Sequence, residues 1–254
     1  MLDPTRRFSS RVQNYLKYRP SYPPAIIALL ESECGLRSES IIAEPGSGTG
    51  LLTEIFLKNG NPVFGIEPNA EMRLAGQRVL ASYPRFSSID ATAEATTLTD
   101  QSVDFIVAGQ AFHWFDRQSV QTEFRRILKP AGWVTLIWNG FRTESSPLMA
   151  AYHDLALRHG TDYQEVSREM DHSDLASFFV HGTCKLAHFT FQQTFDYEGL
   201  EGRLLSSSFV PEPNHPGYEP MLRDLRAMFD AHQKHGRVAF EYDTEVYYGQ
   251  LSAG

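Results

Sequence analysis

The sequence has few cysteines and no long apolar run. Its two cysteines, Cys34 and Cys184, lie far apart in a chain of 254 residues. They can form neither a disulfide framework nor a Cys-x-x-Cys pair, so we expect free thiols in a reducing compartment. No membrane-spanning length of uncharged apolar residues occurs, and the start MLDPTRRFSSRVQNYLKYRP has no apolar signal segment. We therefore expect a soluble, cytoplasmic protein with no membrane partner.

Basic residues are also few. Lys and Arg number 23 against 31 Asp and Glu, which gives a net charge of −8, and no basic cluster is dense enough to follow a phosphate backbone. We therefore expect no nucleic-acid partner. The histidines other than His113 show no metal-ligand spacing supported by Cys or carboxylates, so no metal site is predicted. The sequence leaves the oligomeric state open.

The chain is long enough, and apolar enough at 42% hydrophobic residues, for one large domain with a buried core. In its first half, short apolar runs alternate with stretches of helical periodicity, which is typical of a parallel sheet with crossover helices. Two alternating segments near the end predict antiparallel strands, with helices before and between them. The segments expected to form strands are SIIAEP, PVFGIEP, RFSSID, VDFIVAG, WVTLIWN, KLAHFTFQQTFDY and RVAFEYDTEVYYG. The sequence thus predicts an α/β fold: a doubly wound, mostly parallel seven-stranded sheet with an antiparallel edge and a helical cap.

A glycine-rich segment, EPGSGTG, joins the first expected strand to the following helix. Its glycines, Gly46, Gly48 and Gly50, occupy every second position. Such a turn lets the backbone approach a ligand without interference from a Cβ, and the helix N-terminus offers free N–H groups. Ligands of open parallel sheets bind at the carboxyl ends of the strands, so we expect these glycines to face one. A tight turn without a ligand is the alternative.

The residues that follow indicate a nucleoside. Leu51 occupies the position of the third glycine in the dinucleotide pattern G-x-G-x-x-G, so that pattern is incomplete. The next expected strand ends in Glu67, where a carboxylate can accept hydrogen bonds from both hydroxyls of a ribose. A solvated surface glutamate is the alternative to this role.

Six motifs occur in order between residues 18 and 134: YRPSYP, EPGSGTG, GIEPNAEM, DATAE, VDFIVAGQAFHWFD and ILKPAGWV. Together they resemble the class I S-adenosylmethionine-dependent methyltransferases, in particular the small-molecule, methyltransferase type 11-like group. The resemblance implies a Rossmann-like methyltransferase fold, S-adenosylmethionine as cofactor and S-adenosylhomocysteine as product. It also implies methyl transfer to a small-molecule partner by in-line displacement. The second half of the chain resembles the family's extra strands and cap only loosely.

The resemblance further implies which residues contact the cofactor. Each position is carried over from a motif quoted above, and the expected contacts run along the carboxyl ends of four strands. They assign the methionine moiety to Gly46, Gly48 and Gly50, the ribose to Glu67 with its neighbour Pro68, the adenine to Asp90 and Ala91, and the sulfonium side to Gln110.

Three further cofactor contacts are open to more than one interpretation. Glu44 stands where the family usually has Asp, so it can reach the cofactor's ammonium differently or through water. Tyr18 and Arg19 belong to an N-terminal segment that closes over the cofactor in the family, where Arg19 can bind the methionine carboxylate through paired donors. A surface helix end explains Tyr18 and Arg19 nearly as well.

The acceptor is expected after the fourth strand, where His113 and Trp114 lie in GQAFHWF. A histidine there can act as a general base, because its unperturbed pKa is near 6.5. A structural histidine in an aromatic wall is the alternative. Tyr22 is expected to join His113 and Trp114 in the substrate pocket. The sequence does not determine the acceptor or whether its O, N, C or S atom is methylated.

These expectations divide a single domain, residues 1–254, into three parts. Residues 1–40 form an N-terminal lid and lead-in helix, residues 41–140 the cofactor-binding core, and residues 141–254 the cap helices and antiparallel edge strands. Two competing functions remain. One is a non-catalytic or non-methylating S-adenosylmethionine-binding protein, because the fold does not dictate the reaction. The other is a nicotinamide-dependent oxidoreductase, which Leu51 disfavours.

Overall fold

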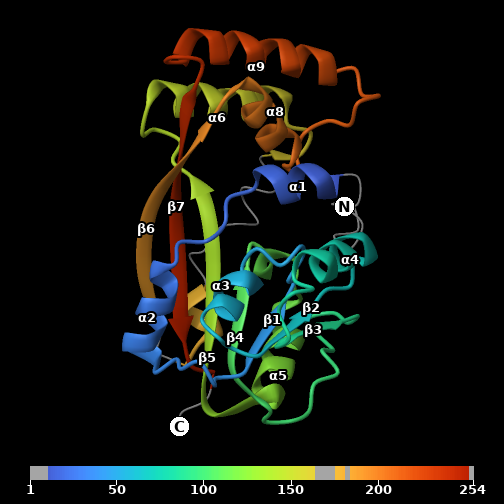
Figure 1. Cartoon of the computed structure of the whole chain (residues 1–254), viewed down its shortest axis with the longest axis vertical. Coiled ribbons are helices and arrows are strands. Elements are labelled where there is room, and N and C mark those ends of the chain that lie inside the picture. Colours follow the sequence, from blue (N-terminus) through green and yellow to red (C-terminus); the bar gives the residue numbers. More distant parts are fainter. Residues whose placement is uncertain (1–10, 164–174, 181–183, 252–254) are drawn as a thin grey trace.

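The computed structural model describes residues 11–163, 175–180 and 184–251 (Figure 1). Seven strands form one sheet in the order β3-β2-β1-β4-β5-β7-β6. Strands β1 to β5 are parallel, and β7 pairs antiparallel with both β5 and β6. The predicted mostly parallel sheet with an antiparallel edge is thus confirmed. The strands are β1 (Ile42–Pro45), β2 (Val63–Ile66), β3 (Phe86–Ile89), β4 (Val103–Gly109), β5 (Leu128–Phe141), β6 (Lys185–Phe195) and β7 (Val238–Gly249).

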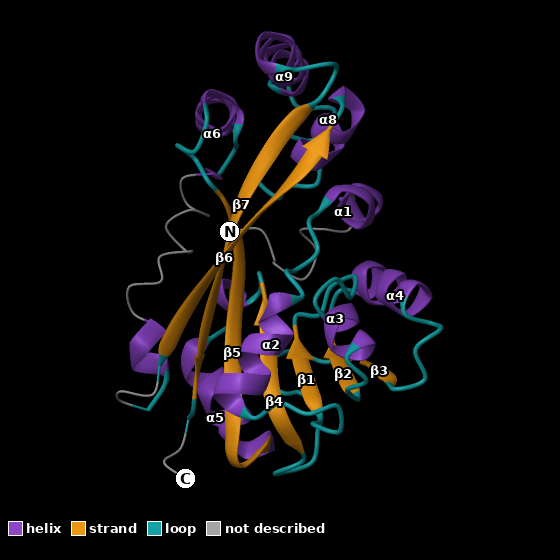
Figure 2. Ribbon diagram, turned by 60° about the vertical axis from the view of Figure 1, so that its left-hand side comes forward, coloured by secondary structure: helices purple, strands orange, loops and turns teal. Residues whose placement is uncertain are grey.

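Helices cover both faces of the parallel strands (Figure 2). Ile42 and Ala43 are neighbours in β1 but lie in two different apolar clusters, because successive side chains of a strand point to opposite faces. Ile42 packs with α2 (Ala25–Cys34) and α3 (Thr53–Lys58), and Ala43 packs with α5 (Arg117–Ile127). Burial on both faces explains the continuous apolar sequences of the central strands.

A helical cap stands at one end of the sheet (Figure 1). It consists of α6 (Pro147–His159), α8 (Tyr197–Leu205) and α9 (Tyr218–His232), which form a separate apolar cluster with the adjoining ends of β6 and β7. Helix α1 (Val12–Tyr18) contacts both α8 of the cap and α4 (Ala70–Val79) of the core. The cap, the core and α1 therefore surround a space above the parallel strands.

Several predicted boundaries differ from the structure. The helix expected over TGLLTEIFLKN, residues 49–59, starts only at Thr53. Gly50, inside the expected segment, has a φ of 87°, which a right-handed helix excludes. Strand β5 begins at Leu128, ahead of the expected WVTLIWN segment.

The predicted division into lid, core and cap stays a prediction, and the first ten residues of the predicted lid lie outside the described residues. Within the described ranges, no helix combines the length and the apolar character needed to cross a membrane.

Candidate functional site

Two adjoining cavities lie at the carboxyl ends of the parallel strands. Strands β1 and β4 are neighbours at the point where the strand order reverses, which is where open α/β sheets bind ligands. One cavity has a volume of about 300 Å³ and the other about 720 Å³. Tyr15, Gln110 and Trp114 line both of them. The two cavities therefore adjoin at these three residues.

The glycine loop forms part of the wall of the smaller cavity. A Cβ on Gly46 would approach the Cβ of Ala111 to 2.5 Å, and one on Gly48 would meet Met72 Cε at 3.3 Å. Both glycines also have positive φ, so other residues would be strained there. The lining residues are Tyr15, Gly46, Gly48, Glu67, Pro68, Asn69, Met72, Thr92, Ala93, Glu94, Gly109, Gln110, Ala111, Trp114 and Phe115.

Glu67 connects the glycine loop to the next strand. Its Oε2 accepts a hydrogen bond from the N–H of Gly48 at 2.9 Å, and its Oε1 accepts one from the N–H of Asn69 at 2.8 Å. Burial raises the pKa of Glu67, and these two N–H donors oppose the rise. Each carboxylate oxygen has two acceptor positions, so both oxygens can still accept a hydrogen bond from a ligand.

Glu44 lies behind the glycine loop and lines neither cavity. It is 2% exposed and accepts a hydrogen bond from Thr53 Oγ1 at 2.6 Å. Burial raises its pKa to about 8, and repulsion from Glu67 acts in the same direction. From this position, the predicted contact of Glu44 with a ligand would have to be indirect.

Three other predicted cofactor contacts also lie outside the cavity walls. A Cβ on Gly50 would stand 2.5 Å from Leu80 Cδ1, so this glycine permits close packing of the loop on the core. Asp90 is exposed and forms an ion pair with Arg73 at 2.7 Å. Ala91 is not a lining residue, and the wall beyond β3 is made by the next three residues, Thr92, Ala93 and Glu94. The DATAE motif, residues 90–94, contains both the predicted contacts and the three residues that line the cavity. The sequence alone did not determine which of these five residues face the cavity.

Of the three site residues predicted in the N-terminal segment, one lines a cavity and two do not. Tyr18 donates a hydrogen bond to Glu198 at 3.0 Å, and its ring packs on Gly202, so it joins α1 to α8. Tyr22 is buried behind Gly109 and lines neither cavity. Arg19, in contrast, lines the larger cavity.

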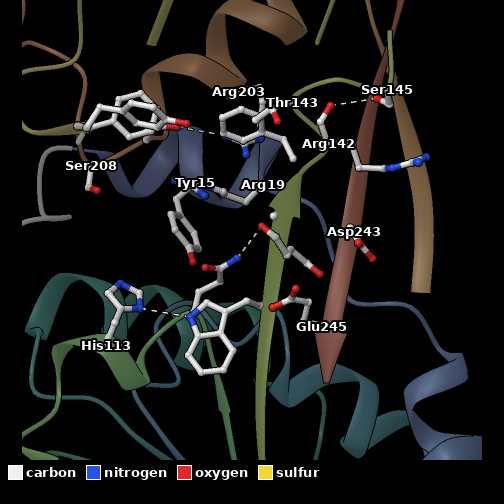
Figure 3. Close-up of a pocket in the computed structure, with 18 of the residues that line it drawn as sticks. Tyr15, Arg19, His113, Arg142, Thr143, Ser145, Arg203, Ser208, Asp243 and Glu245 are labelled. Carbon is white, nitrogen blue, oxygen red and sulfur yellow. Dashed lines mark hydrogen bonds between the residues drawn. The ribbon is translucent and has the colours of Figure 1, made fainter. Parts of the chain in front are cut away.

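Arg19 is held beside a second arginine. Its Nη2 donates to the carbonyl oxygen of Ser206 at 3.0 Å, and its guanidinium lies over the Tyr15 ring at 5.2 Å. Burial, followed by repulsion from Arg203, lowers the pKa of Arg19 to about 10. Figure 3 shows Arg19, Tyr15 and Arg203 gathered on one side of the larger cavity.

The larger cavity lies between the core and the cap. Its walls come from α1, the end of β5, the loop that follows β5, the segment after α8, and β7. Sequence reasoning missed most of these residues because they come from segments far apart in the chain. The lining residues are Tyr15, Arg19, Gln110, His113, Trp114, Trp138, Asn139, Gly140, Phe141, Arg142, Thr143, Glu144, Ser145, Tyr163, Arg203, Ser207, Ser208, Phe209, Asp243 and Glu245.

His113 and Gln110 are both oriented by the end of β5. Trp138 Nε1 donates to His113 Nδ1 at 3.4 Å (Figure 3). Gln110 has a φ of 55°, and its Nε2 donates to the carbonyl oxygen of Asn139 at 2.7 Å. Because Nδ1 of His113 accepts this bond, the neutral ring carries its proton on Nε2. In the described ranges no group of three or more His, Cys, Asp or Glu side chains could hold a metal ion.

Comparisons with known proteins find similarity to methyltransferases. Residues 43–136 match the family model described as a methyltransferase domain. An uncharacterized methyltransferase of Schizosaccharomyces pombe is 34% identical over 143 residues, which cover 56% of this chain and 55% of that protein. An uncharacterized methyltransferase-like protein of the same yeast is 29% identical over 209 residues, covering 81% of this chain and 78% of that protein. The chain spans about half the length of the curated relatives that it matches above 30% identity.

A solved structure extends the similarity to the whole fold. It belongs to a protein of Anaeromyxobacter dehalogenans proposed to be a type II methyltransferase. The TM-score is 0.71 at 21% identity, and the match covers 93% of this chain and 100% of the other. At this level of identity the match shows a common fold that includes the antiparallel edge and the cap.

Proposed function

We propose that this protein transfers a methyl group from S-adenosylmethionine to a small-molecule acceptor, because residues 43–136 match the family model described as a methyltransferase domain. The observation that carries the proposal is that the two cavities adjoin, with Tyr15, Gln110 and Trp114 lining both. A cofactor in the smaller cavity and an acceptor in the larger one would meet there.

The smaller cavity suits the nucleoside part of this cofactor. Gly46 and Gly48 line this cavity together with Glu67, whose carboxylate retains acceptor positions for two ribose hydroxyls. Pro68 and the wall formed by residues 92–94 would then border the adenine. Arg19 would bind the methionine carboxylate from the larger cavity, because an arginine can donate two parallel hydrogen bonds to a carboxylate.

The bound cofactor supplies an electrophilic methyl group on a sulfonium, so the protein's own contribution is alignment and the exclusion of water. Gln110 is fixed by its hydrogen bond to Asn139 and would hold one side of the place where the two cavities meet. Trp114 would cover another side. His113 can donate a hydrogen bond from Nε2 to the acceptor, but in this tautomer the same nitrogen cannot accept the acceptor's proton.

The size and position of the larger cavity support a small-molecule acceptor. Its volume of about 720 Å³ lies within the range of small-molecule sites, roughly 300–1,000 Å³. Aromatic side chains at Trp138, Phe141 and Phe209 supply apolar contact area, and the cap covers one side. An apolar or aromatic body of the acceptor would fit these walls.

A thermal-shift titration tests the cofactor part of the proposal directly. Purified protein is titrated with S-adenosylmethionine, S-adenosylhomocysteine and, as the control, NAD. A ligand at 100 times its dissociation constant adds about 2.7 kcal/mol of stability, or roughly 5–10 °C for a domain of this size. We expect a shift with both sulfur nucleotides and none with NAD. A shift with NAD alone, or none with either sulfur nucleotide, would refute the proposal.

A further inference from the structure

Arg203 is a buried cation that faces the larger cavity. It belongs to the cap helix α8, is 3% exposed, and lines the larger cavity but not the smaller one. Burying a charged group costs several kcal/mol unless a partner compensates it, and arginine is therefore almost never fully buried unpaired. The partners of Arg203 consequently indicate what the cavity is built to hold.

The partners that the structure gives Arg203 are neutral. Its Nε donates to the hydroxyl of Tyr242 at 2.9 Å, and its Nη1 donates to Ser207 Oγ at 3.1 Å. The guanidinium also lies over the rings of Phe240 and Tyr242, at 5.3 and 5.6 Å from their centroids. Among the described parts of the chain, no carboxylate forms an ion pair with Arg203, and its Nη2 makes no hydrogen bond.

These neutral contacts fix the orientation of the guanidinium without neutralising its charge. A hydroxyl on one nitrogen, a second hydroxyl on another and two aromatic faces leave the planar group little freedom. An arginine held in this way has lost its side-chain entropy before a ligand arrives, so it can bind a planar or tetrahedral anion at low further cost. Arg203 is therefore a preorganised anion-binding group.

Three acidic residues, Glu144, Asp243 and Glu245, line the larger cavity. Asp243 and Glu245 belong to β7 and lie below Arg203 in Figure 3. Asp243 lies 3.6 Å from His188 Nδ1, and Glu245 accepts a hydrogen bond from the Tyr247 hydroxyl at 3.3 Å. These carboxylates do not supply the counterion of Arg203.

One cofactor carboxylate cannot neutralise two cations. Arg19 and Arg203 both line the larger cavity, and the charge of Arg203 contributes to the lowered pKa of Arg19. If Arg19 binds the methionine carboxylate, one positive charge remains on Arg203. A negative charge on the molecule that enters the larger cavity next would compensate Arg203.

We propose that the methyl acceptor is an anionic small molecule whose carboxylate or phosphate group is bound by Arg203. This inference rests on the proposed function, since it assigns the larger cavity to the acceptor. Arg203 is a specificity-determining residue in this arrangement, and the aromatic walls at Trp138, Phe141 and Phe209 bind the apolar body of the same molecule.

The test uses matched probes on protein saturated with S-adenosylhomocysteine. Benzoate, neutral benzamide and inorganic phosphate are each titrated by calorimetry. Benzoate and benzamide have nearly the same shape and differ in charge. We expect benzoate to bind at least about tenfold more tightly than benzamide, the factor that corresponds to 1.4 kcal/mol. Tighter binding of benzoate than of phosphate would identify a carboxylic acid as the acceptor class, and the reverse order a phosphate ester.

Variants locate the anion site. We expect Arg203→Gln to weaken benzoate binding by about tenfold or more, because one charge-assisted bidentate contact is lost. The affinity of Arg203→Gln for S-adenosylhomocysteine should stay within about twofold of the wild-type value. Arg203→Lys keeps the positive charge and should recover part of the benzoate binding. Arg158→Gln removes the same charge from the surface of α6, where Arg158 pairs with Asp224 at 2.8 Å, and should change neither affinity.

The outcomes separate the two proposals. Equal binding of benzoate and benzamide, including no binding of either, would overturn the anionic acceptor, as would unchanged benzoate binding in Arg203→Gln. Failure of S-adenosylhomocysteine to bind wild-type protein would instead overturn the proposed function. If Arg203→Gln does not fold, the wild-type comparison of benzoate with benzamide and the Arg203→Lys variant decide the matter.

Discussion

The carboxylate of Glu67 holds the backbone of Gly48, whose N–H donates to Oε2 at 2.9 Å. Glu67 follows β2 and Gly48 follows β1, so this hydrogen bond ties together the loops of two neighbouring strands. The other carboxylate oxygen binds the N–H of Asn69, the residue that caps α4. A single side chain thus fixes two parts of the smaller cavity in addition to any contact that it makes with a ligand.

Replacing Glu67 should weaken cofactor binding. In Glu67→Gln one acceptor oxygen becomes an NH₂ group, which would face a backbone N–H, and the charge is lost. Hydrogen bonds to charged groups contribute about 1.5–3 kcal/mol, so we expect roughly 10- to 100-fold weaker binding of S-adenosylhomocysteine by calorimetry. Glu71→Gln, at an exposed position of α4, is the control. An unchanged affinity in Glu67→Gln would contradict the assignment of the ribose to this cavity.

Gly50 and Gly48 should respond differently to substitution by alanine: the first change should mainly lower stability, and the second should mainly weaken cofactor binding. Gly50→Ala combines a φ of 87° with a Cβ 2.5 Å from Leu80 Cδ1, so we expect a loss of about 2–4 kcal/mol in the free energy of unfolding. Gly48→Ala meets only the end of the flexible Met72 side chain but projects beside the smaller cavity. It should cost less stability and weaken S-adenosylhomocysteine binding by about tenfold or more.

Urea denaturation and calorimetry on the two glycine variants give both quantities. The expectation fails if Gly50→Ala changes affinity more than stability, or if Gly48→Ala binds S-adenosylhomocysteine as tightly as the wild type.

Glu44 should make the stability of the protein depend on pH. Burial raises the pKa of Glu44 to about 8 in the folded protein, from an ordinary value of 4.5. Between these values the folded protein keeps a proton that the unfolded chain has lost, so stability falls as the pH rises through this window. Glu44→Gln should flatten this fall and raise the free energy of unfolding above pH 8 by up to about 5 kcal/mol, since each pH unit of the window contributes roughly 1.4 kcal/mol.

Urea denaturation at several pH values from about 5 to about 8.5 measures the effect of Glu44. Glu31→Gln, at the exposed surface of α2, serves as the control. If the free energy of unfolding changes with pH in the same way in the wild type and in Glu44→Gln, the expectation is wrong. Glu44 would then ionise in the folded protein without lowering its stability.

His113 should orient the acceptor without removing its proton. Nδ1 accepts a hydrogen bond from Trp138 Nε1 at 3.4 Å, so Nε2 carries the proton of the neutral ring. Loss of a general base typically lowers the rate by about 10²- to 10⁴-fold, and we expect His113→Ala to lower kcat by less than about 100-fold. The pH profile of kcat should keep its shape. A larger loss together with the disappearance of a titration near pH 6.5 would instead identify His113 as the general base.

The sequence predicted the parallel half of the fold well because its signals are local. A strand buried on both faces needs a continuous apolar run, as in VDFIVAG, and the φ values of the loop after β1 require glycine. Glu67 could be assigned to a ligand site for the same reason, since its place at the end of β2 follows from the pattern around it. The positions of Gly46, Gly48, Pro68 and Gln110 in the cavity walls agree with those expectations, although their contacts with a cofactor remain predictions.

The sequence did not reveal which side chains would lie beside one another across the site. Arg203 has no local pattern that separates it from a surface arginine of an amphipathic helix, and Tyr22 and Gly50 look like site residues although they pack inside the core. The tertiary structure decided these points, because burial and charge depend on segments distant in the sequence. Arg203 becomes an uncompensated cation only when α8 docks against β7 and α1 brings Arg19 beside it.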